Sequence, residues 1–408
     1  MKILYLSGYD SAGQQFNGIL LHRALRAMGH ESSYAVLDQS LHEPGIYQLG
    51  TPRQRKVNEW ASSLERGLSL RCVLPTLGRA LFSEPYYHDS QLIHLQLLHA
   101  KQFFSLLSIP RLSRHAPVVW TMHDPWLTTG HCIHPLACQR WLTGCGKCPD
   151  LTIPVPMRRD HTALNWRIKK RVLEKSNVHL VVASEWMRDR ARRSPILAHL
   201  PCTIIPFGVD RTVFRPRDKV ECRRQLGIPA AARVITLRWT PYNMFKGTNY
   251  ALQALETLSP GVVTHVVMLD SDNAAGAETI AGKYQCVPLG WVTDRERIIM
   301  ALCASDIFVM PSIAETFGMM AVEAMACGTP VIAFEGTSLP EVIRAPESGI
   351  AVPYGDSMAL MQALERVMLD GAYRTRLVAN GLKLVAEEYT EEKYIQRHLE
   401  LYRSILGS

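Results

Sequence analysis

The sequence lacks several features that would place the protein outside the class of folded, globular proteins. No apolar run approaches the roughly 18 residues that a membrane-spanning helix needs. The opening stretch, MKILYLSGYD, has too short an apolar segment for a secretory signal peptide and runs directly into a Gly/Asp turn. No internal repeat or low-complexity segment stands out along the chain. We therefore expect a globular protein of the cytosol.

Length and composition suggest two domains. The chain has 408 residues, of which 47% are apolar and 20% charged, and domains of roughly 150–200 residues each are the usual outcome at this length. Ten cysteines would suggest disulfides in a small secreted protein. In a large cytosolic protein a local cluster more often indicates metal binding or catalysis.

The net charge of +8 is concentrated in one part of the chain. Residues 151–200 contain eleven basic and four acidic side chains, and the basic ones lie between residues 158 and 193. This segment is either a solvated helix face or a patch that meets an anionic membrane surface or an anionic acceptor. No nucleic-acid module accompanies it, so we expect no nucleic-acid partner.

Short apolar runs alternate with longer helical patterns, which is typical of parallel βαβ units. A turn-rich stretch, residues 205–216, separates two series of expected strands. The first series comprises Lys2–Leu6, Ser33–Leu37, Leu92–Leu95, Val118–Met122, His179–Ala183 and Thr203–Ile205. The second comprises Val234–Arg238, Val262–Leu269, Cys286–Leu289, Ile307–Met310, Pro330–Phe334 and Ile350–Val352.

These two series predict two doubly wound α/β domains, residues 1–205 and 206–390. Residues 391–408 include an amphipathic helical pattern, Glu391–Leu406, which we expect to pack back on the first domain. Ligands of such sheets bind outside the carboxyl ends of the strands. With two facing domains, the cleft between them is the expected site.

One stretch, ETFGMMAVEAMACGTPV, places Glu315 and Glu323 among small and apolar residues. A buried carboxylate without partners costs several kcal/mol, so these acids either lie on a solvated face or meet a ligand. The pattern predicts a helix that begins near Phe317, directly after the strand Ile307–Met310. Backbone N–H groups at such a helix start form an anion site.

The wider segment PSIAETFGMMAVEAMACGTPVIAFEGTSLPEVI resembles the signature of family 4 of the GT-B glycosyltransferases. LGWVTDRERIIMALCASDIFVMPS before it and ESGIAVPYGD after it fit as well, and the resemblance covers nearly the whole chain. It implies a GT-B fold and a retaining hexosyltransferase. The donor would be a nucleotide-diphosphate sugar. The acceptor would be a glycan, including a lipid-linked one, in bacterial surface polysaccharide synthesis at the inner face of the membrane.

The resemblance also implies roles for individual residues. Glu323 would accept hydrogen bonds from the ribose of the donor, and Glu315 would bind hydroxyls of the transferred sugar. Arg238 and Lys246 would bind the diphosphate through charge-assisted hydrogen bonds. The backbone N–H groups that would also receive the diphosphate are those of Phe317, Gly318 and Met319.

No catalytic metal is expected, although the triplet Asp270-Ser271-Asp272 matches the D-x-D motif of metal-dependent transferases. The resemblance argues against that use of the triplet. In the first domain, the loop SGYDSAGQQFNG supplies Gly13 as the residue that would approach donor or acceptor. The usual Gly-Gly-Ala-Glu run of the family is absent from this loop.

His123 follows the strand Val118–Met122, at the position where the family has its active-site histidine. It would orient the sugar or stabilise positive charge. Asp124 beside it is a second candidate, for which a structural role is the favoured interpretation. The HLQ stretch, His94–Gln96, also resembles an exopolysaccharide-type subgroup of the family. In that subgroup the third residue of the stretch is often His.

Four cysteines follow His123 with the spacing C-x5-C-x6-C-x2-C, and the CGKC turn is of the kind that holds zinc. A structural zinc site, a disulfide pair and four reduced thiols are the open alternatives. The cysteines are Cys132, Cys138, Cys145 and Cys148.

Two other functions compete with sugar transfer. Sugar-nucleotide epimerases share the two-domain architecture, but the pair of glutamates eight residues apart, Glu315 and Glu323, argues against them. A non-catalytic sugar-nucleotide-binding regulator would require lost catalytic groups, and Lys246 and His123 are both present.

Overall fold

The computed structural model describes residues 1–10, 18–99, 101–153, 156–240, 242–270, 278–292 and 294–407. Its contacts divide the chain into two compact units. Unit 1 comprises Met1–Ile205 and Ile395–Ser408, and unit 2 comprises Pro206–Tyr394. No helix in the described part of the chain is long and apolar enough to cross a membrane.

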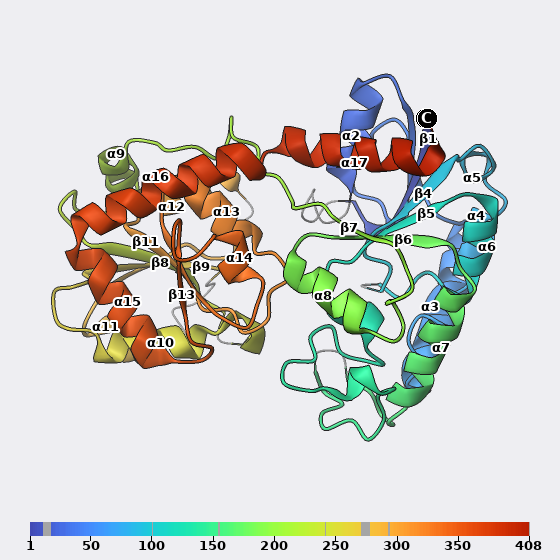
Figure 1. Ribbon diagram of the computed structural model, residues 1–408, viewed down its shortest axis with the longest axis horizontal. Coiled ribbons are helices and arrows are strands. Elements are labelled where there is room, and N and C mark those ends of the chain that lie inside the picture. Colours follow the sequence, from blue (N-terminus) through green and yellow to red (C-terminus); the bar gives the residue numbers. More distant parts are fainter. Residues whose placement is uncertain are drawn as a thin grey trace. The chain divides into compact units, whose positions relative to one another are not determined.

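Unit 1 contains a seven-stranded sheet in which every strand pair is parallel (Figure 1). In spatial order the strands are β3 (Ile46–Gln48), β2 (Glu31–Asp38), β1 (Lys2–Tyr9), β4 (Leu92–Leu95), β5 (Val118–Thr121), β6 (Val178–Val182) and β7 (Cys202–Ile204). The central strands β4 and β5 are buried along their whole length. Such continuous burial is typical of a parallel sheet covered on both faces.

The helices of unit 1 connect these strands. They are α2 (Ile19–Ala27), α3 (Pro52–Gly67), α4 (Gly78–Leu81), α5 (Pro85–His88), α6 (Ile109–His115), α7 (Thr162–Glu174) and α8 (Glu185–Arg193), with the short 3-10 turns η1 (Leu106–Ser108), η2 (Pro125–Thr128) and η3 (Arg140–Leu142). The last helix, α17 (Glu391–Leu406), belongs to unit 1 from Ile395 onward. The buried Tyr402 of α17 bonds Tyr5 of β1, with 3.0 Å between the hydroxyl oxygens.

Unit 2 contains a six-stranded parallel sheet. In spatial order its strands are β10 (Gln285–Pro288), β9 (His265–Leu269), β8 (Val234–Arg238), β11 (Ile307–Met310), β12 (Val331–Phe334) and β13 (Ile350–Val352). The helices are α9 (Lys219–Gln225), α10 (Thr248–Thr257), α11 (Glu278–Ala281), α12 (Arg295–Ala304), α13 (Met319–Ala326), α14 (Leu339–Val342), α15 (Ser357–Leu369) and α16 (Gly371–Glu388), with the 3-10 turn η4 (Met244–Lys246).

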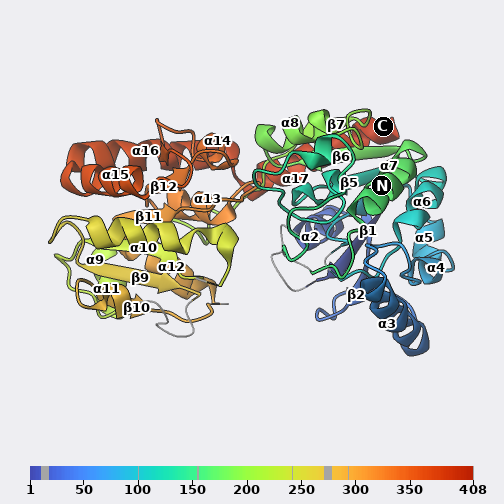
Figure 2. The same cartoon turned by 90° about the horizontal axis from the view of Figure 1, so that it is seen from below.

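Helices lie on both faces of the unit 2 sheet. On one face α10 contacts α11 and α15, and on the other α12 contacts α9 and α13, while α13 contacts α16 (Figures 1 and 2). The two units are therefore both doubly wound α/β folds, as the sequence predicts. The strands Leu92–Leu95, Val234–Arg238, Ile307–Met310 and Ile350–Val352 have the predicted bounds, as does the helix Glu391–Leu406.

The sequence misplaces the start of one strand by three residues and misses another strand. The strand expected at Val262–Leu269 begins only at His265, because Val262 and Val263 are buried in the preceding loop instead. The edge strand β3 was not expected. It has only three residues and buries one of them, so it carries no alternating pattern.

Candidate active site

The carboxyl end of β11 in unit 2 brings two of the predicted site residues together. Glu315 lies in the loop between β11 and α13, and Lys246 ends the turn η4. The Lys246 Nζ lies 3.0 Å from the Glu315 Oε2, and both side chains are mostly buried, with 20% and 15% of their surface exposed. The structure thus pairs the predicted phosphate ligand with the predicted sugar ligand.

Gly247 explains why Lys246 is held at this edge of the sheet. Its φ of 68° lies in the left-handed region, and a Cβ at this position would meet the Pro311 carbonyl oxygen at 1.8 Å. Only glycine allows the backbone to pass so close to the end of β11. The Asn243 side chain accepts a hydrogen bond from the backbone N–H of Phe245 and shapes the same turn.

The helix α13 begins at Met319, two residues later than the sequence predicts, because Gly318 adopts a φ of 92° and forms its N-cap. A Cβ on Gly318 would meet the Leu339 side chain at 2.4 Å. Phe317 therefore lies before the helix, and its side chain is buried. Glu323 is the fifth residue of α13, just over one turn from its start.

The Glu323 carboxyl has an unusual protonation equilibrium. Burial raises its pKa to about 7, although the positive charges of Arg295 and Arg238 act in the opposite direction. The partly buried Glu323 carboxyl is therefore only partly ionised near neutral pH.

Arg238, at the end of β8, is also paired with a carboxylate. Its Nε lies 2.5 Å from the Asp270 Oδ2. Asp270 is the first residue of the D-x-D triplet, and its φ of 63° is left-handed. The other two residues of the triplet lie outside the described residues. Asp270 therefore engages the predicted phosphate ligand Arg238 directly.

In unit 1, His123 follows β5 and forms a hydrogen bond with Gln96, with 2.7 Å between the His123 Nε2 and the Gln96 Oε1. An amide oxygen only accepts, so the His123 Nε2 carries the hydrogen. Burial lowers the pKa of His123 to about 3, despite the neighbouring Asp124. His123 is therefore a neutral imidazole at physiological pH.

Gln96 connects His123 to a buried polar network. The Gln96 Nε2 lies 3.2 Å from the His94 Nε2, which is also 2.7 Å from the Thr121 hydroxyl. The His94 Nδ1 lies 2.6 Å from the Tyr402 hydroxyl of α17. The HLQ stretch thus links the C-terminal helix to the histidine. In the sequence, this stretch stands out only through its resemblance to the subgroup, and the network itself was not predicted.

Asp124, the second candidate at this strand end, is held by hydrogen bonds to its neighbours. It accepts hydrogen bonds from the Trp126 backbone N–H at 2.9 Å and from the His99 Nε2 at 2.9 Å. Burial opposes its ionisation, but His99 and these bonds lower its pKa to about 2. Sequence reasoning missed His99, since nothing in the spacing of the chain relates it to Asp124.

Lys169 was counted in the basic segment 158–193, but it is buried and can take no part in a surface patch. Its Nζ donates to the backbone oxygens of Trp126, at 2.5 Å, and Thr129, at 2.8 Å, and lies 3.5 Å from the centre of the Trp126 ring. It thereby braces the loop that follows His123.

The four clustered cysteines line one small cavity of about 20 Å³, together with His131 and Trp141. All ten cysteines of the chain are free thiols. Across the described ranges, no group of three or more His, Cys, Asp or Glu side chains is positioned to hold a metal ion. The Cys145 Sγ accepts a hydrogen bond from the Gly130 N–H at 3.3 Å. Zinc binding by this cluster stays a prediction.

Two family models match successive parts of the chain. The model for glycosyltransferase family 4 matches residues 19–213, and the model for glycosyl transferases group 1 matches residues 242–384. The chain belongs to this family of glycosyltransferases.

Named relatives agree with this assignment. The glycosyltransferase is 24% identical over 325 residues to WcaC of Escherichia coli, a glycosyl transferase assigned to colanic acid biosynthesis, covering 77% of this chain and 76% of that protein. It is 30% identical over 224 residues to the D-inositol 3-phosphate glycosyltransferase of Saccharomonospora viridis, covering 50% of each. The chain spans about half the length of that relative.

Solved structures identify the fold of this glycosyltransferase as GT-B. Sucrose-phosphate synthase from Thermosynechococcus elongatus superposes with a TM-score of 0.70 at 23% identity, covering 99% of both chains. HepE from Anabaena, solved in complex with UDP-glucose, gives a TM-score of 0.69 at 18% identity, covering 99% of this chain and 100% of that one.

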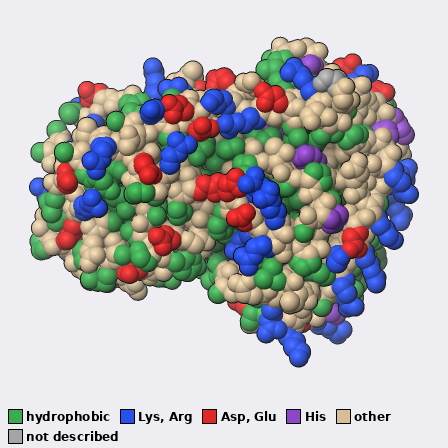
Figure 3. Space-filling model, viewed as in Figure 1, with side chains coloured by type: hydrophobic (Ala, Val, Ile, Leu, Met, Phe, Trp, Pro, Cys, Tyr) green, Lys and Arg blue, Asp and Glu red, His purple; other side chains and the backbone are tan. Residues whose placement is uncertain are grey.

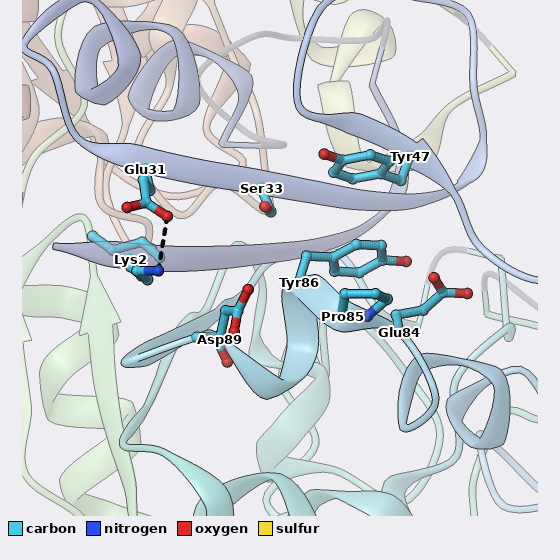
Figure 4. A pocket seen from close by; sticks show the side chains of 10 residues that line it. Lys2, Glu31, Ser33, Tyr47, Glu84, Pro85, Tyr86 and Asp89 are labelled. Atoms are coloured by element: carbon cyan, nitrogen blue, oxygen red, sulfur yellow. Dashed lines mark ion pairs between the residues drawn. The ribbon is translucent and has the colours of Figure 1, made fainter.

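A larger cavity of the glycosyltransferase, about 400 Å³, lies elsewhere in unit 1 (Figure 4). Lys2 and Glu31, which begin β1 and β2, form an ion pair at its wall, and Tyr47 and Tyr86 stack beside it with ring centres 4.6 Å apart. These are the amino ends of the strands, opposite the edge that carries His123. The cavity is therefore separate from the candidate site. Gly13 lies outside the described residues.

Proposed function

We propose that this glycosyltransferase moves a sugar from a nucleotide-diphosphate sugar to a glycan acceptor with retention of the anomeric configuration, in bacterial surface polysaccharide synthesis. The observation that carries the proposal is the pairing of Lys246 with Glu315 directly before the start of α13. The colanic acid assignment of WcaC supports a polysaccharide product. The complexes of HepE with UDP and UDP-glucose support a nucleotide-sugar donor.

The diphosphate would bind where positive charge and backbone donors meet. Lys246 and Arg238 supply charge-assisted hydrogen bonds, and the first N–H groups of α13 supply the positive end of the helix dipole. Gly318 leaves room for a phosphate near this helix start. These groups would neutralise the diphosphate without a divalent cation.

The two glutamates would bind the hydroxyl-bearing parts of the donor. Glu323 would accept hydrogen bonds from the ribose, and Glu315 from the transferred sugar. Phosphate oxygens would compete with Glu315 for the Lys246 ammonium, which leaves the Glu315 oxygens available to accept from sugar hydroxyls. Donor binding would therefore exchange one partner of Glu315 for another.

During transfer, the bond from the anomeric carbon to the phosphate oxygen breaks and a bond to the acceptor oxygen forms on the same face. The acceptor proton passes to the departing phosphate. Lys246, Arg238 and the start of α13 stabilise the charge that develops on that phosphate. His123, neutral and held by Gln96, would orient the sugar and stabilise positive charge on it rather than act as the base.

The acceptor side and the cellular location are further parts of the proposal. Gly13 and the loop around it would approach the substrates from unit 1. The acceptor would be a glycan, either free or carried on a lipid, and a lipid-linked acceptor would bring the enzyme to the inner face of the membrane. The resemblance to family 4 supports this assignment, as does the basic segment 158–193 without Lys169.

Two measurements test the proposed function. Thermal shift against UDP, GDP and ADP and their sugars identifies the donor, because a ligand at about 100 times its dissociation constant adds roughly 2.7 kcal/mol of stability. NMR of the product from an isotopically labelled donor then gives the anomeric configuration. A retained configuration is expected, and an inverted one overturns the proposal. A donor whose sugar is epimerised without any acceptor would identify an epimerase instead.

A further inference from the structure

Helix α3 of unit 1 and its C-cap residue, Leu68, present large apolar side chains to solvent. Val57, Trp60, Leu64 and Leu68 are 56%, 72%, 46% and 44% exposed. Their spacing of three, four and four residues places them along one side of the helix. We call these four residues the α3 stripe. A stripe of this kind is unusual on a monomeric protein surface and marks an interaction site.

The inward face of α3 is polar and fixes the helix in place without the stripe. The Asn58 Oδ1 accepts from the Thr76 backbone N–H at 2.8 Å, and the Glu65 Oε1 accepts from the Val73 N–H at 2.5 Å. The buried Ser62 hydroxyl donates to a backbone carbonyl 2.9 Å away. The stripe is therefore not required to attach α3 to the fold.

Both ends of α3 are also fixed. At the start, Thr51 and Gln54 form a reciprocal capping box. Beyond the last turn, the Ser69 hydroxyl accepts from the backbone N–H groups of Arg158 and Arg159 at 3.0 and 2.9 Å. The beginning of the basic segment thus rests against the end of α3.

Basic side chains accompany the stripe. Arg53, Lys56 and Arg66 on α3 are exposed, and so are Arg158 and Arg159 beside it. Within the described part of the chain, none of the five belongs to an ion pair. Figure 2 shows α3 at the outer edge of unit 1, and Figure 3 shows Lys and Arg side chains along the edge over α6 and α7.

We propose that the α3 stripe and these five basic residues dock the enzyme on an anionic lipid bilayer, with α3 lying in the plane of the interface. Helices that bind membranes in this way combine Trp and Leu on one side with Lys and Arg beside them. The apolar side chains enter the boundary between headgroups and acyl chains, while the basic groups meet headgroup phosphates. The positive charge beside the stripe favours an anionic bilayer over a neutral apolar partner.

Varying the salt concentration separates the electrostatic from the apolar contribution to membrane binding. Each Lys or Arg near an anionic surface is worth about a fivefold change in affinity, and this part weakens at high ionic strength. The contribution of Trp60 and Leu64 comes from removing apolar surface from water and persists in salt. This docking rests on the membrane location in the proposed function. It needs no sugar donor, so flotation can succeed or fail independently of the proposed transfer reaction.

The test is flotation of the full chain with vesicles of phosphatidylcholine alone or with added phosphatidylglycerol. We expect the wild type to float with the anionic vesicles only, and Trp60→Ser with Leu64→Ser to weaken binding at least tenfold. The pair Arg158→Gln with Arg159→Gln should weaken binding at low salt and have little effect at high salt. Trp291→Ser is the matched control, because Trp291 in unit 2 is 60% exposed but lies outside the stripe.

Four results would overturn the proposal. The first is a wild type that does not float with anionic vesicles. The second is a Trp60→Ser, Leu64→Ser variant that floats as well as the wild type, with an unchanged melting temperature. The third is a wild-type dimer in analytical ultracentrifugation that this variant dissociates, which would assign the stripe to a contact between two copies. The fourth is an equal loss of vesicle binding in Trp291→Ser, which would remove the assignment to α3.

Discussion

Replacing Glu323 with glutamine tests the electrostatics of the candidate donor site directly. Burial raises the pKa of Glu323 from its ordinary 4.5 to about 7. One pKa unit corresponds to 1.36 kcal/mol, so a shift of this size is worth at most about 3 kcal/mol. Because Glu323 keeps part of its surface exposed, we expect about 2 kcal/mol in practice.

The direction follows from proton linkage. The folded state holds the Glu323 proton more tightly than the unfolded state. Below the unfolded pKa near 4.5 the carboxyl is protonated in both states, so the cost of burying a charged carboxylate is absent. As pH rises from there, the unfolded chain ionises first and stability falls until the pH passes the folded pKa near 7. Above that pH the loss is complete and constant.

The Glu323→Gln variant keeps the shape of the side chain and cannot ionise. Relative to the variant, the wild type should therefore lose about 2 kcal/mol of unfolding free energy between pH 4.5 and pH 8. Urea unfolding at several pH values measures this difference. Glu335→Gln is the control, because Glu335 is an exposed carboxyl of the same unit. Parallel stability curves for the wild type and Glu323→Gln would refute the reasoning.

The same protonation should couple to nucleotide binding. Ribose hydroxyls donate hydrogen bonds most favourably to the ionised carboxylate. Nucleotide binding should therefore release a proton from Glu323 and tighten as pH rises from 6 to 8. Calorimetry in two buffers with different ionisation enthalpies detects this release. A pH-dependent affinity that is unchanged in Glu323→Gln would place the ribose elsewhere.

The remaining predictions concern other residues of the site. Lys246→Ala should weaken UDP binding by roughly 1.5–3 kcal/mol in calorimetry while uridine binding changes little, and equal effects on both would remove Lys246 from the phosphate site. His123→Ala should lower kcat by orders of magnitude with UDP affinity retained. Gln96→Leu should lower kcat less, with Gln96→Glu restoring part of it. Freshly purified protein should contain about one zinc per chain and lose it in Cys145→Ser, whereas elemental analysis without metal would leave reduced thiols. Turnover should survive brief EDTA treatment.

Much of the fold could be predicted because a buried parallel strand has an unmistakable composition. IFVM at Ile307–Met310 and LIHL at Leu92–Leu95 are buried at every position, so the apolar run and the strand coincide. β3 could not be predicted in this way, since only Ile46 of its three residues is buried. Helix α3 buries the polar Asn58 and Glu65 and exposes Trp60. The spacing of its apolar residues would therefore predict the wrong face of the helix as the buried one.

For the site, the sequence predicts which residue types are present, but not their ion pairs or their protonation. Lys246 and Glu315 are 69 positions apart, and nothing local in either segment indicates that they form an ion pair. The left-handed φ of Gly318, which delays the start of α13 to Met319, accompanies close packing against Leu339 that the local sequence does not report. The protonation of Glu323 depends on burial, which spacing does not report.

The pairing of each cation with a carboxylate has a consequence for how the donor site works. Lys246 is held by Glu315 and Arg238 by Asp270, so neither cation has to be desolvated alone in the folded enzyme. A diphosphate brings at least two negative charges to the same two cations. It can replace the carboxylates only if they gain other donors, and sugar hydroxyls are such donors for Glu315. A complete nucleotide sugar therefore satisfies more of this site than a bare diphosphate does, which favours productive binding of the whole donor.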